Sequence, residues 1–224
     1  MIPIHHESEV KKLLEEHGHK PFRYAQIAHA LYKDNYTDWD DVTTLPKEVK
    51  TLLKEETTMD TLKIDHQSTS SDDQTTKFLF ETHDGNKIES VIMRHKGGRN
   101  TLCVSSQVGC AMACVFCATG KLGFTRNLTC HEIIEQIMVA RRVLASEGKV
   151  LRNIVFMGMG EPLLNYSEMS RALEVMTNQK KLNMSSRRIT ISTCGIVPAI
   201  RKMAEEFPQV CLAISLHAPN DEAR

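Results

Sequence analysis

From residue 100 onward the sequence alternates short apolar runs with amphipathic segments, and this alternation constrains the fold more than any other feature. The apolar runs are expected to form strands and the segments between them helices. Repeated β-α units place parallel strands side by side with helices packed against them. The expected strands are 102–104, 154–156, 189–192 and 210–214. The sequence therefore predicts an α/β fold, an incomplete (β/α) barrel of about four units.

The helices of this region carry their own signals. Thr129 and Glu132 have the spacing of a capping box and predict a helix start. Asn165 and Glu168 are expected to cap the next helix, and 197–206 is expected to form a third. In barrels of this kind the functional residues gather at the carboxyl ends of the strands. That edge is where we expect the site.

Three cysteines follow the first of these strands, Cys110, Cys114 and Cys117, at the spacing C-x3-C-x2-C. Thiolates at this spacing in a glycine-containing loop can converge on one inorganic cluster. Three protein ligands, rather than four, indicate a cluster with one iron open to a small molecule. Two other interpretations stay open. The trio can be inert buried thiols, or a zinc site with Cys103, Cys130 or His131 as its fourth ligand.

Candidate ligand-binding residues follow the other strands. A GxGE loop, Gly158 to Glu161, comes after the second strand, and its glycines predict close approach of a ligand to the backbone. Ser192 ends the third strand, and the run Ser215-Leu216-His217 ends the fourth. These positions are expected to meet the cysteine loop at one edge of the sheet.

The residues before 100 divide into two expected units. Residues 1–60 predict a small helical domain with three apolar stripes, whose core Trp39 and Phe22 are expected to close. Residues 61–99 alternate with period two and predict a short antiparallel sheet that links this domain to the core at 100–224. A cluster of cations, Arg94, His95, Lys96 and Arg99, predicts either a phosphate-contacting rim or a solvated loop.

Composition sets limits on the function class. The 28 basic and 28 acidic side chains balance, which argues against a strongly basic nucleic-acid binder, although residues 61–160 carry a mild basic excess. Seven cysteines, three of them clustered, favour metal binding in a reducing compartment over a disulfide framework. The sequence contains neither a membrane-spanning apolar run nor a signal-peptide pattern, so a cytoplasmic protein is expected.

The motifs at 103–129 and 156–165, taken together, resemble the RlmN/Cfr family of radical S-adenosylmethionine (radical SAM) RNA adenine methyltransferases. The resemblance runs from about Pro21 to the last residue. It implies a [4Fe-4S] cluster on the three cysteines, with SAM at the open iron. It also implies that SAM is lined by a further set of residues: Gly160, Glu161, Ser192, Ser215, Leu216 and His217.

The resemblance also implies the reaction, which is methylation of carbon 2 of an adenine in 23S rRNA and in tRNAs. The family transfers the methyl group through a methyl-cysteine, and Cys103 matches the second cysteine, which resolves the protein–RNA adduct. Glu89 matches the glutamate that handles the proton lost from adenine. Flavodoxin or ferredoxin is implied as the electron donor, and we expect a monomer whose helical domain either grips RNA or only caps the core.

One feature departs from the family pattern. After Cys117 the sequence holds only Cys130, Cys194 and Cys211, none at the position of the methyl-carrying cysteine. We therefore expect a truncated chain that does not methylate RNA by itself. The run 161–165 resembles the RlmN branch more than the Cfr branch, which modifies carbon 8. The alternatives are a non-enzymatic RNA-binding module with structural zinc and a radical SAM enzyme with another substrate, such as Cfr-like methylation of carbon 8.

Overall fold

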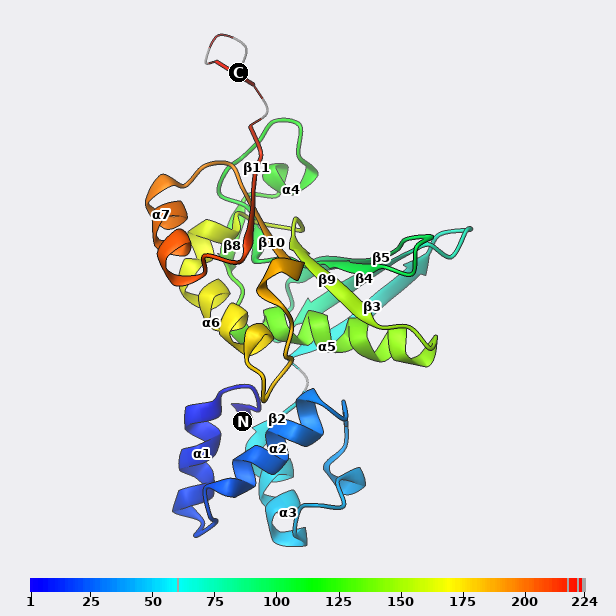
Figure 1. The fold of residues 1–224 in the computed structure, drawn as a ribbon, viewed down its shortest axis with the longest axis vertical. Helices are drawn as coiled ribbons and strands as arrows, with labels where there is room; N and C mark the ends of the chain where they lie inside the picture. Colours follow the sequence, from blue (N-terminus) through cyan, green and yellow to red (C-terminus); the bar gives the residue numbers. More distant parts are fainter. Residues whose placement is uncertain (60, 217, 221, 223–224) are drawn as a thin grey trace.

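A seven-stranded sheet organises the molecule in the computed structural model, which describes residues 1–224 except 60, 217, 221, 223 and 224. The strand order is β11-β10-β9-β6-β5-β4-β3. Helices from the second half of the chain pack against this sheet, and the helices of the first sixty residues form a separate group below it (Figure 1).

Four strands of the sheet are parallel, and they come from the part of the chain that alternates apolar runs with amphipathic segments. The predicted α/β architecture with a partial (β/α) barrel is confirmed. The parallel strands are β6 (Asn100–Cys103), β9 (Leu151–Phe156), β10 (Ile189–Thr193) and β11 (Cys211–Ile214).

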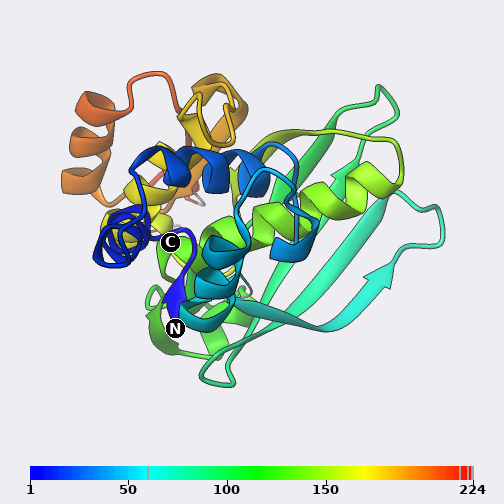
Figure 2. The same ribbon diagram turned by 90° about the horizontal axis from the view of Figure 1, so that it is seen from below.

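Helices connect these strands and bury their apolar faces on the sheet. They are α5 (Cys130–Ser146), α6 (Tyr166–Thr177) and α7 (Val197–Glu206), with the short 3-10 turns η2 (Pro162–Asn165) and η3 (Ser186–Arg188). Figure 2 shows α5 running along one face of the sheet. The capping box at its start is confirmed, since Thr129 accepts from the Glu132 backbone and the Glu132 carboxylate accepts from that of Thr129.

The predicted start of α6 after Asn165 is confirmed, but the predicted capping interaction is wrong. Asn165 precedes the helix but makes no capping bond. Its amide instead donates to the carbonyls of Ser106 and Leu128, both at 2.8 Å, and Glu168 accepts from the backbone N–H of Cys130. Both side chains thus join α6 to the segments around the cysteine loop.

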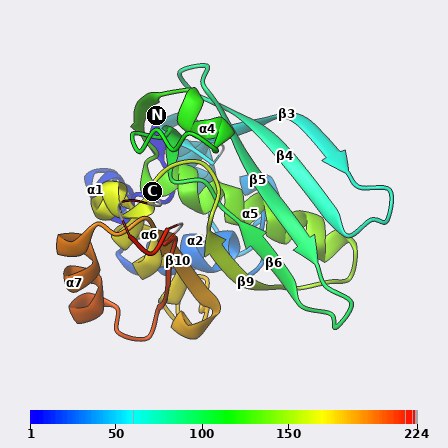
Figure 3. The same cartoon turned by 90° about the horizontal axis from the view of Figure 1, so that it is seen from above.

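The antiparallel strands are β3 (Leu62–Thr69), β4 (Thr75–Thr82) and β5 (Lys87–Arg94), and they belong to the same sheet as the parallel strands, because β5 pairs with β6. One face of this part buries apolar side chains, Phe78, Phe80, Ile88 and Ile92, all with 0% exposure. The opposite face is open, and Figure 3 shows these strands extending away from α7. The domain limits at residues 60 and 99 stay a prediction.

The first sixty residues form α1 (Glu7–Glu16), α2 (Phe22–Tyr32), η1 (Trp39–Asp41) and α3 (Lys47–Glu56), with a two-stranded parallel pair of β1 (Ile2–Pro3) and β2 (Thr57–Thr58). Trp39 lies in their core, as expected. The prediction for Phe22 is wrong, since its ring is 51% exposed and lies beneath the guanidinium of Arg23.

Polar groups join this helical part to the core. Nδ1 of His5 lies 2.9 Å from the Tyr32 hydroxyl, and Nε2 of His5 lies 3.6 Å from Oε2 of Glu135 on α5. Arg141 of α5 donates to the carbonyl of Tyr32 at 2.7 Å. The His131 ring packs edge-on against His6, with centroids 5.3 Å apart. The contact therefore contains several buried ionisable groups.

Within the described part of the chain, every helix is too short or too polar to cross a membrane.

Candidate functional site

A small hairpin closes the base of the cysteine loop. Its strands are β7 (Gln107–Gly109) and β8 (Phe124–Asn127), which pair antiparallel. The N–H of Cys110 donates to the carbonyl of Gly123 at 2.8 Å. Gly109 has φ of +74°, and a Cβ there would lie 1.9 Å from the Gly123 carbonyl oxygen. Only glycine permits this closure.

The three thiols lie within this closed loop and are half-buried and free. The N–H of Cys117 donates to the Cys114 carbonyl at 3.0 Å, and the short helix α4 (Ala118–Lys121) follows. Burial raises the pKa of the Cys110 thiol, and the nearby Cys114, Cys117 and Glu161 raise it further. A bound cation or cluster would offset this mutual repulsion of thiolates.

The donor set fits an iron–sulfur cluster in kind and number, because it consists of three cysteine thiols on one glycine-closed loop. In the described residues no three His, Cys, Asp or Glu side chains are arranged as a ready metal cage. Two of the three residues named as a possible fourth zinc ligand, His131 and Cys130, lie in other surroundings. His131 packs on the helical part at His5 and His6, and Cys130 is buried at the start of α5.

The GxGE loop packs directly onto the segment before the cysteines. A Cβ on Gly158 would lie 2.7 Å from Oγ of Ser105, and one on Gly160 would lie 2.5 Å from Cβ of Gln107. The N–H of Ser106 donates to the Met159 carbonyl at 2.8 Å. The two glycines thus allow the GxGE loop to pack closely against the backbone around Ser105 and Gln107. The contact of Gly160 with SAM stays a prediction.

Glu161 is buried and connects two strand ends. Its carboxylate accepts from the backbone N–H of Leu163 at 3.0 Å and from that of Cys194 at 2.9 Å. Its own N–H donates to Oε1 of Gln107. A carboxylate has further acceptor positions beyond these two bonds. Glu161 therefore fixes the end of β9 against the end of β10, beside the thiol loop.

The next strand ends bring two hydroxyls together. Oγ of Ser192 on β10 lies 3.0 Å from Oγ of Ser215, which follows β11. Leu216 is 59% exposed beside them. His217 lies outside the described residues. Ser192 and Ser215 therefore lie side by side at the carboxyl edge of the sheet, as expected from their places at the ends of neighbouring strands. Their contact with SAM stays a prediction.

Glu89 and Cys103 share the open face of the sheet. Cys103 on β6 pairs with Val91 on β5 and with Val155 on β9, and Glu89 lies two residues before Val91. Burial raises the pKa of the Cys103 thiol. Nζ of Lys77 on β4 lies 2.9 Å from Oε1 of Glu89. The roles of Glu89 and Cys103 in catalysis stay predictions.

Sequence reasoning missed the buried polar residues that assemble this edge. The Ser105 hydroxyl donates to the Glu89 carbonyl and accepts from the N–H of Met159 at 2.9 Å, which links β5 to the GxGE loop. Gln107 donates to Asn127 at 2.8 Å and accepts from Glu161. Both residues lie in the run between Cys103 and Cys110, which is polar yet buried. Burial is not visible in the sequence, so the three consecutive polar residues at 105–107 gave no signal of this role.

Cys194 was also missed. It directly follows β10 and is exposed, and its thiol titrates with its pKa raised to about 12, through partial burial and the adjacent Glu161 carboxylate.

Arg126 anchors the second strand of the loop hairpin. Its guanidinium makes two bonds to Asp84 in the β4–β5 turn, at 2.7 and 2.8 Å, and two to Glu132 on α5, at 2.9 and 2.8 Å. Glu132 is also the capping-box residue. One side chain therefore joins β8, the hairpin turn and the start of α5.

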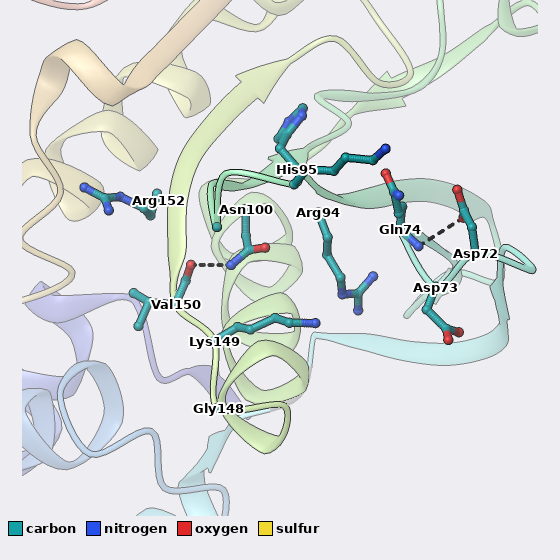
Figure 4. Close-up of a pocket in the computed structure, with 12 residues that line it drawn as sticks. Asp72, Asp73, Gln74, Arg94, His95, Asn100, Gly148, Lys149, Val150 and Arg152 are labelled. Atoms are coloured by element: carbon teal, nitrogen blue, oxygen red, sulfur yellow. Dashed lines mark hydrogen bonds between the residues drawn. The ribbon is translucent and has the colours of Figure 1, made fainter.

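The cationic cluster before residue 100 lies away from the thiol loop, at the turn between β5 and β6 (Figure 4). Arg94 is held by both carboxylate oxygens of Glu147 and by Thr76. Hydrogen bonds from Arg94 and from Lys149 lower the pKa of Glu147 to about 2. The guanidinium of Arg94 is therefore occupied by contacts within the protein and is not available to a phosphate. The side chains of His95, Lys96 and Arg99 are exposed.

Comparison with known proteins agrees with this geometry. Residues 104–224 match the Radical SAM superfamily. The chain is 46% identical over 216 residues to a probable dual-specificity RNA methyltransferase RlmN from Bacillus licheniformis, covering 96% of this chain and 59% of that protein. It is 44% identical over 223 residues to the ribosomal RNA large subunit methyltransferase N of Nitrosopumilus maritimus, covering 96% of this chain and 64% of that one.

A solved structure extends the match to the fold. The crystal structure of a radical SAM methyltransferase from Sphaerobacter thermophilus superposes with a TM-score of 0.94 at 41% identity, covering 99% of this chain and 65% of that one. The chain therefore spans about three fifths of the length of these relatives. The resemblance to the RlmN/Cfr family that the motifs indicated is confirmed. On the family match and the structural likeness together, this chain belongs to the radical SAM superfamily.

Proposed function

We propose that this chain carries the cluster-binding and SAM-binding part of an enzyme that methylates carbon 2 of adenine in RNA. The observation that carries the proposal is the closed loop of three free thiols, packed against the GxGE loop through Ser106, Gln107 and Gly160. Relatives that are 43% to 46% identical and are named as RlmN methyltransferases support the RNA substrate.

Cys110, Cys114 and Cys117 would hold three irons of a [4Fe-4S] cluster, and SAM would take the fourth. When bound, the cluster and SAM supply the one-electron chemistry that makes an unreactive aromatic carbon a methylation target. The chain's own contribution is positioning. Glu161, fixed by Leu163 and Cys194, and the paired hydroxyls of Ser192 and Ser215 would orient the methionyl and ribose parts of SAM.

The open face of the sheet would receive the target adenine. Glu89 would take the proton lost from the adenine carbon. Cys103 would release the RNA from the covalent adduct by forming a disulfide with the methyl-carrying cysteine of the enzyme. Both side chains lie on that face. Cys103 on β6 pairs with Val91 on β5, and Glu89 lies two residues before Val91, which supports a role for both residues in the same reaction. A base must leave its stack to reach such a site, and an unstacked adenine suits the exposed apolar rim formed by Val115 and Phe116.

We assign 23S rRNA and tRNA as the substrates, flavodoxin or ferredoxin as the electron donor, and the cytoplasm as the compartment. All seven cysteines lie in the described residues and are free thiols, which supports a reducing compartment. The RlmN names of the relatives favour carbon 2 over carbon 8. We also propose that the protein is a monomer.

Metal analysis tests the cluster. The chain is reconstituted anaerobically, and iron, sulfide and zinc are counted per chain, alongside a Cys114→Ala variant and a Cys211→Ala control. About four irons and four sulfides per chain, lost in Cys114→Ala and kept in Cys211→Ala, are expected. One zinc and no iron would support the zinc-containing RNA-binding module instead.

The substrate needs a separate measurement. Adenines of 23S rRNA and tRNA are compared by mass spectrometry between cells with the intact gene and cells without it. Loss of 2-methyladenine is expected. Loss of 8-methyladenine would assign the Cfr-like reaction, and unchanged RNA would refute the RNA methyltransferase proposal while leaving the cluster result intact.

A further inference from the structure

Arginines stand at the start of three neighbouring parallel strands, at the edge of the sheet opposite to the thiol loop. Arg99 directly precedes β6, Arg152 is the second residue of β9, and Arg188 directly precedes β10. The order β10-β9-β6 makes these strands direct neighbours, and adjacent strands lie about 4.8 Å apart. All three side chains are exposed. We call this set, together with Lys96, the amino-end cations.

Two adjoining cavities lie beside Lys96, Arg152 and Arg188. One of about 640 Å³ is lined by Lys96, Arg152 and the β5–β6 turn, and one of about 230 Å³ is lined by Arg152 and Arg188. Val150 and Arg152 line both cavities, so the two adjoin at the start of β9, and Arg99 lines neither. Figure 4 shows the larger cavity, with Arg152 on the β9 side and the aspartates on the opposite side.

The amino-end cations lack acidic partners. Across the described residues, none of these four side chains has a hydrogen-bond acceptor or an ion-pair partner. Their neighbours Arg94 and Lys149 are both bound by Glu147 instead. Of the two aspartates, Asp72 accepts from Ser70 and Gln74 within its own turn. Like charges on adjacent strands are unfavourable, and a bound anion would offset that repulsion.

We propose that the amino-end cations form a second RNA-contact surface, which binds backbone phosphates of the substrate away from the reacting base. The proposal rests on the proposed RNA methyltransferase function. Guanidinium groups bind phosphate oxygens in a bidentate geometry, and such contacts position RNA without reading its sequence. The surface therefore contributes affinity and orientation, while the opposite edge performs the chemistry.

The distance between the two edges suits one large RNA. Arg152 and Met157 lie on the same extended segment, five residues apart, which spans about 17 Å at 3.3 Å per residue. A folded tRNA or a domain of 23S rRNA extends well beyond this distance. It can place one adenine at the thiol loop and the phosphates of an adjoining stem at Arg152 and Arg188.

Binding of a fluorescein-labelled RNA stem-loop tests the surface, measured by anisotropy between about 50 and 200 mM salt. The variant is Arg152→Gln/Arg188→Gln, and the control is Arg201→Gln/Lys47→Gln, which removes the same charge from exposed positions on α7 and α3. The slope of log affinity against log salt is expected to fall by about two in the variant and to stay unchanged in the control. The affinity of the variant should fall roughly tenfold or more at 0.1 M salt.

Iron content and urea unfolding, measured on the same samples, are expected to match the unaltered chain, which separates lost contact from lost fold. Equal slopes in variant and control would overturn the surface while leaving the proposed function standing. An unaltered chain that binds no RNA would overturn both. Inorganic tripolyphosphate is titrated in parallel, and a variant that loses only tripolyphosphate binding would show a small-anion site and overturn the RNA assignment.

Discussion

Nζ of Lys77 lies 2.9 Å from Oε1 of Glu89, diagonally across the β4–β5 pair on the open face of the sheet. This is the face that also carries Cys103, two strands from Lys77. The two side chains are 48% and 44% exposed. An ion pair so accessible to water contributes little to folding. Its effect is to fix the direction of the Glu89 carboxylate.

The exposure of this pair predicts a small effect on stability. Lys77→Met is expected to lower the free energy of unfolding by less than about 1 kcal/mol, because solvent screens the pair. Phe78→Ala, at the next residue on the buried face, is expected to cost about 3–5 kcal/mol. Urea titrations of both variants make the comparison. A loss above about 2 kcal/mol in Lys77→Met would show that the pair holds the sheet together, contrary to this prediction.

The sequence predicted the regular elements of the core because their signals are local. β9 ends in the apolar run 154–156, and β10 alternates isoleucine with threonine and serine. The capping box of α5 needs only Thr129 and Glu132, three residues apart. The placement of the candidate residues at one edge followed from strand direction alone. Ser192 and Ser215 are close for this reason, although they lie 23 residues apart in the chain.

The missed features depend on partners that are distant in sequence. Gln107 is buried because Asn127 and Glu161 satisfy its amide, and neither bond leaves a periodic pattern. The strands β7 and β8 have three and four residues, too few for alternation to show. Asn165 is a residue type that often caps helices, but its side-chain amide donates instead to the buried carbonyls of Ser106 and Leu128.

The Arg126 network should be a major source of stability for the loop hairpin. Asp84 and Glu132 hold the pKa of its guanidinium above the usual range. Arg126→Ala is expected to cost about 3–5 kcal/mol, because the Glu132 side chain, 2% exposed, loses its buried cation. Urea unfolding measures the loss. Arg126→Lys should recover part of it, since the charge returns without the bidentate geometry.

The control for Arg126 is Arg171→Ala, which removes an exposed pair with Glu168 within one helix. A change of less than about 1 kcal/mol is expected there. Equal losses in the Arg126 and Arg171 variants would refute the anchoring role of Arg126. Iron content per chain in Arg126→Ala, expected to fall with the hairpin, adds a readout that does not depend on stability.

Acidification should weaken the contact between the helical part and the core, because it favours protonation of the buried His131. Its pKa is lowered to about 3 by burial, with further contributions from His5, His6 and Arg171. The unfolded chain binds this proton near the ordinary value of 6.5 and the folded chain does not. Stability contributed by neutral His131 is therefore complete above pH 6.5 and is lost as the pH falls toward 3.

Urea titrations between about pH 4.5 and 6.5 measure this effect, because most carboxylates stay ionised in that window. The slope attributable to His131 approaches about 1.4 kcal/mol per pH unit. His131→Phe should lose that slope, and His66→Gln, on the exposed strand β3, should keep it. A His131→Phe variant with an unchanged pH dependence would show that other groups destabilise the contact.

Closure of the thiol loop predicts a specific effect of one methyl group. Gly109 and Gly148 have similar backbone angles, φ of +74° and +66°, so alanine at either position carries a left-handed penalty of about 1 kcal/mol. They differ in surroundings. A Cβ at Gly148 meets nothing within 4 Å, whereas one at Gly109 would lie 1.9 Å from the carbonyl oxygen of Gly123.

That carbonyl accepts the N–H of Cys110, so Gly109→Ala should open the base of the loop and displace the first thiol. We expect Gly109→Ala to reduce the iron incorporated per chain by more than half after anaerobic reconstitution, and Gly148→Ala to leave it unchanged. Urea unfolding of both variants separates the two effects, since the left-handed penalty is shared and the steric one is not. Full iron incorporation in Gly109→Ala would show that the thiols find their cluster without the hairpin, and that β7 and β8 play no part in positioning them.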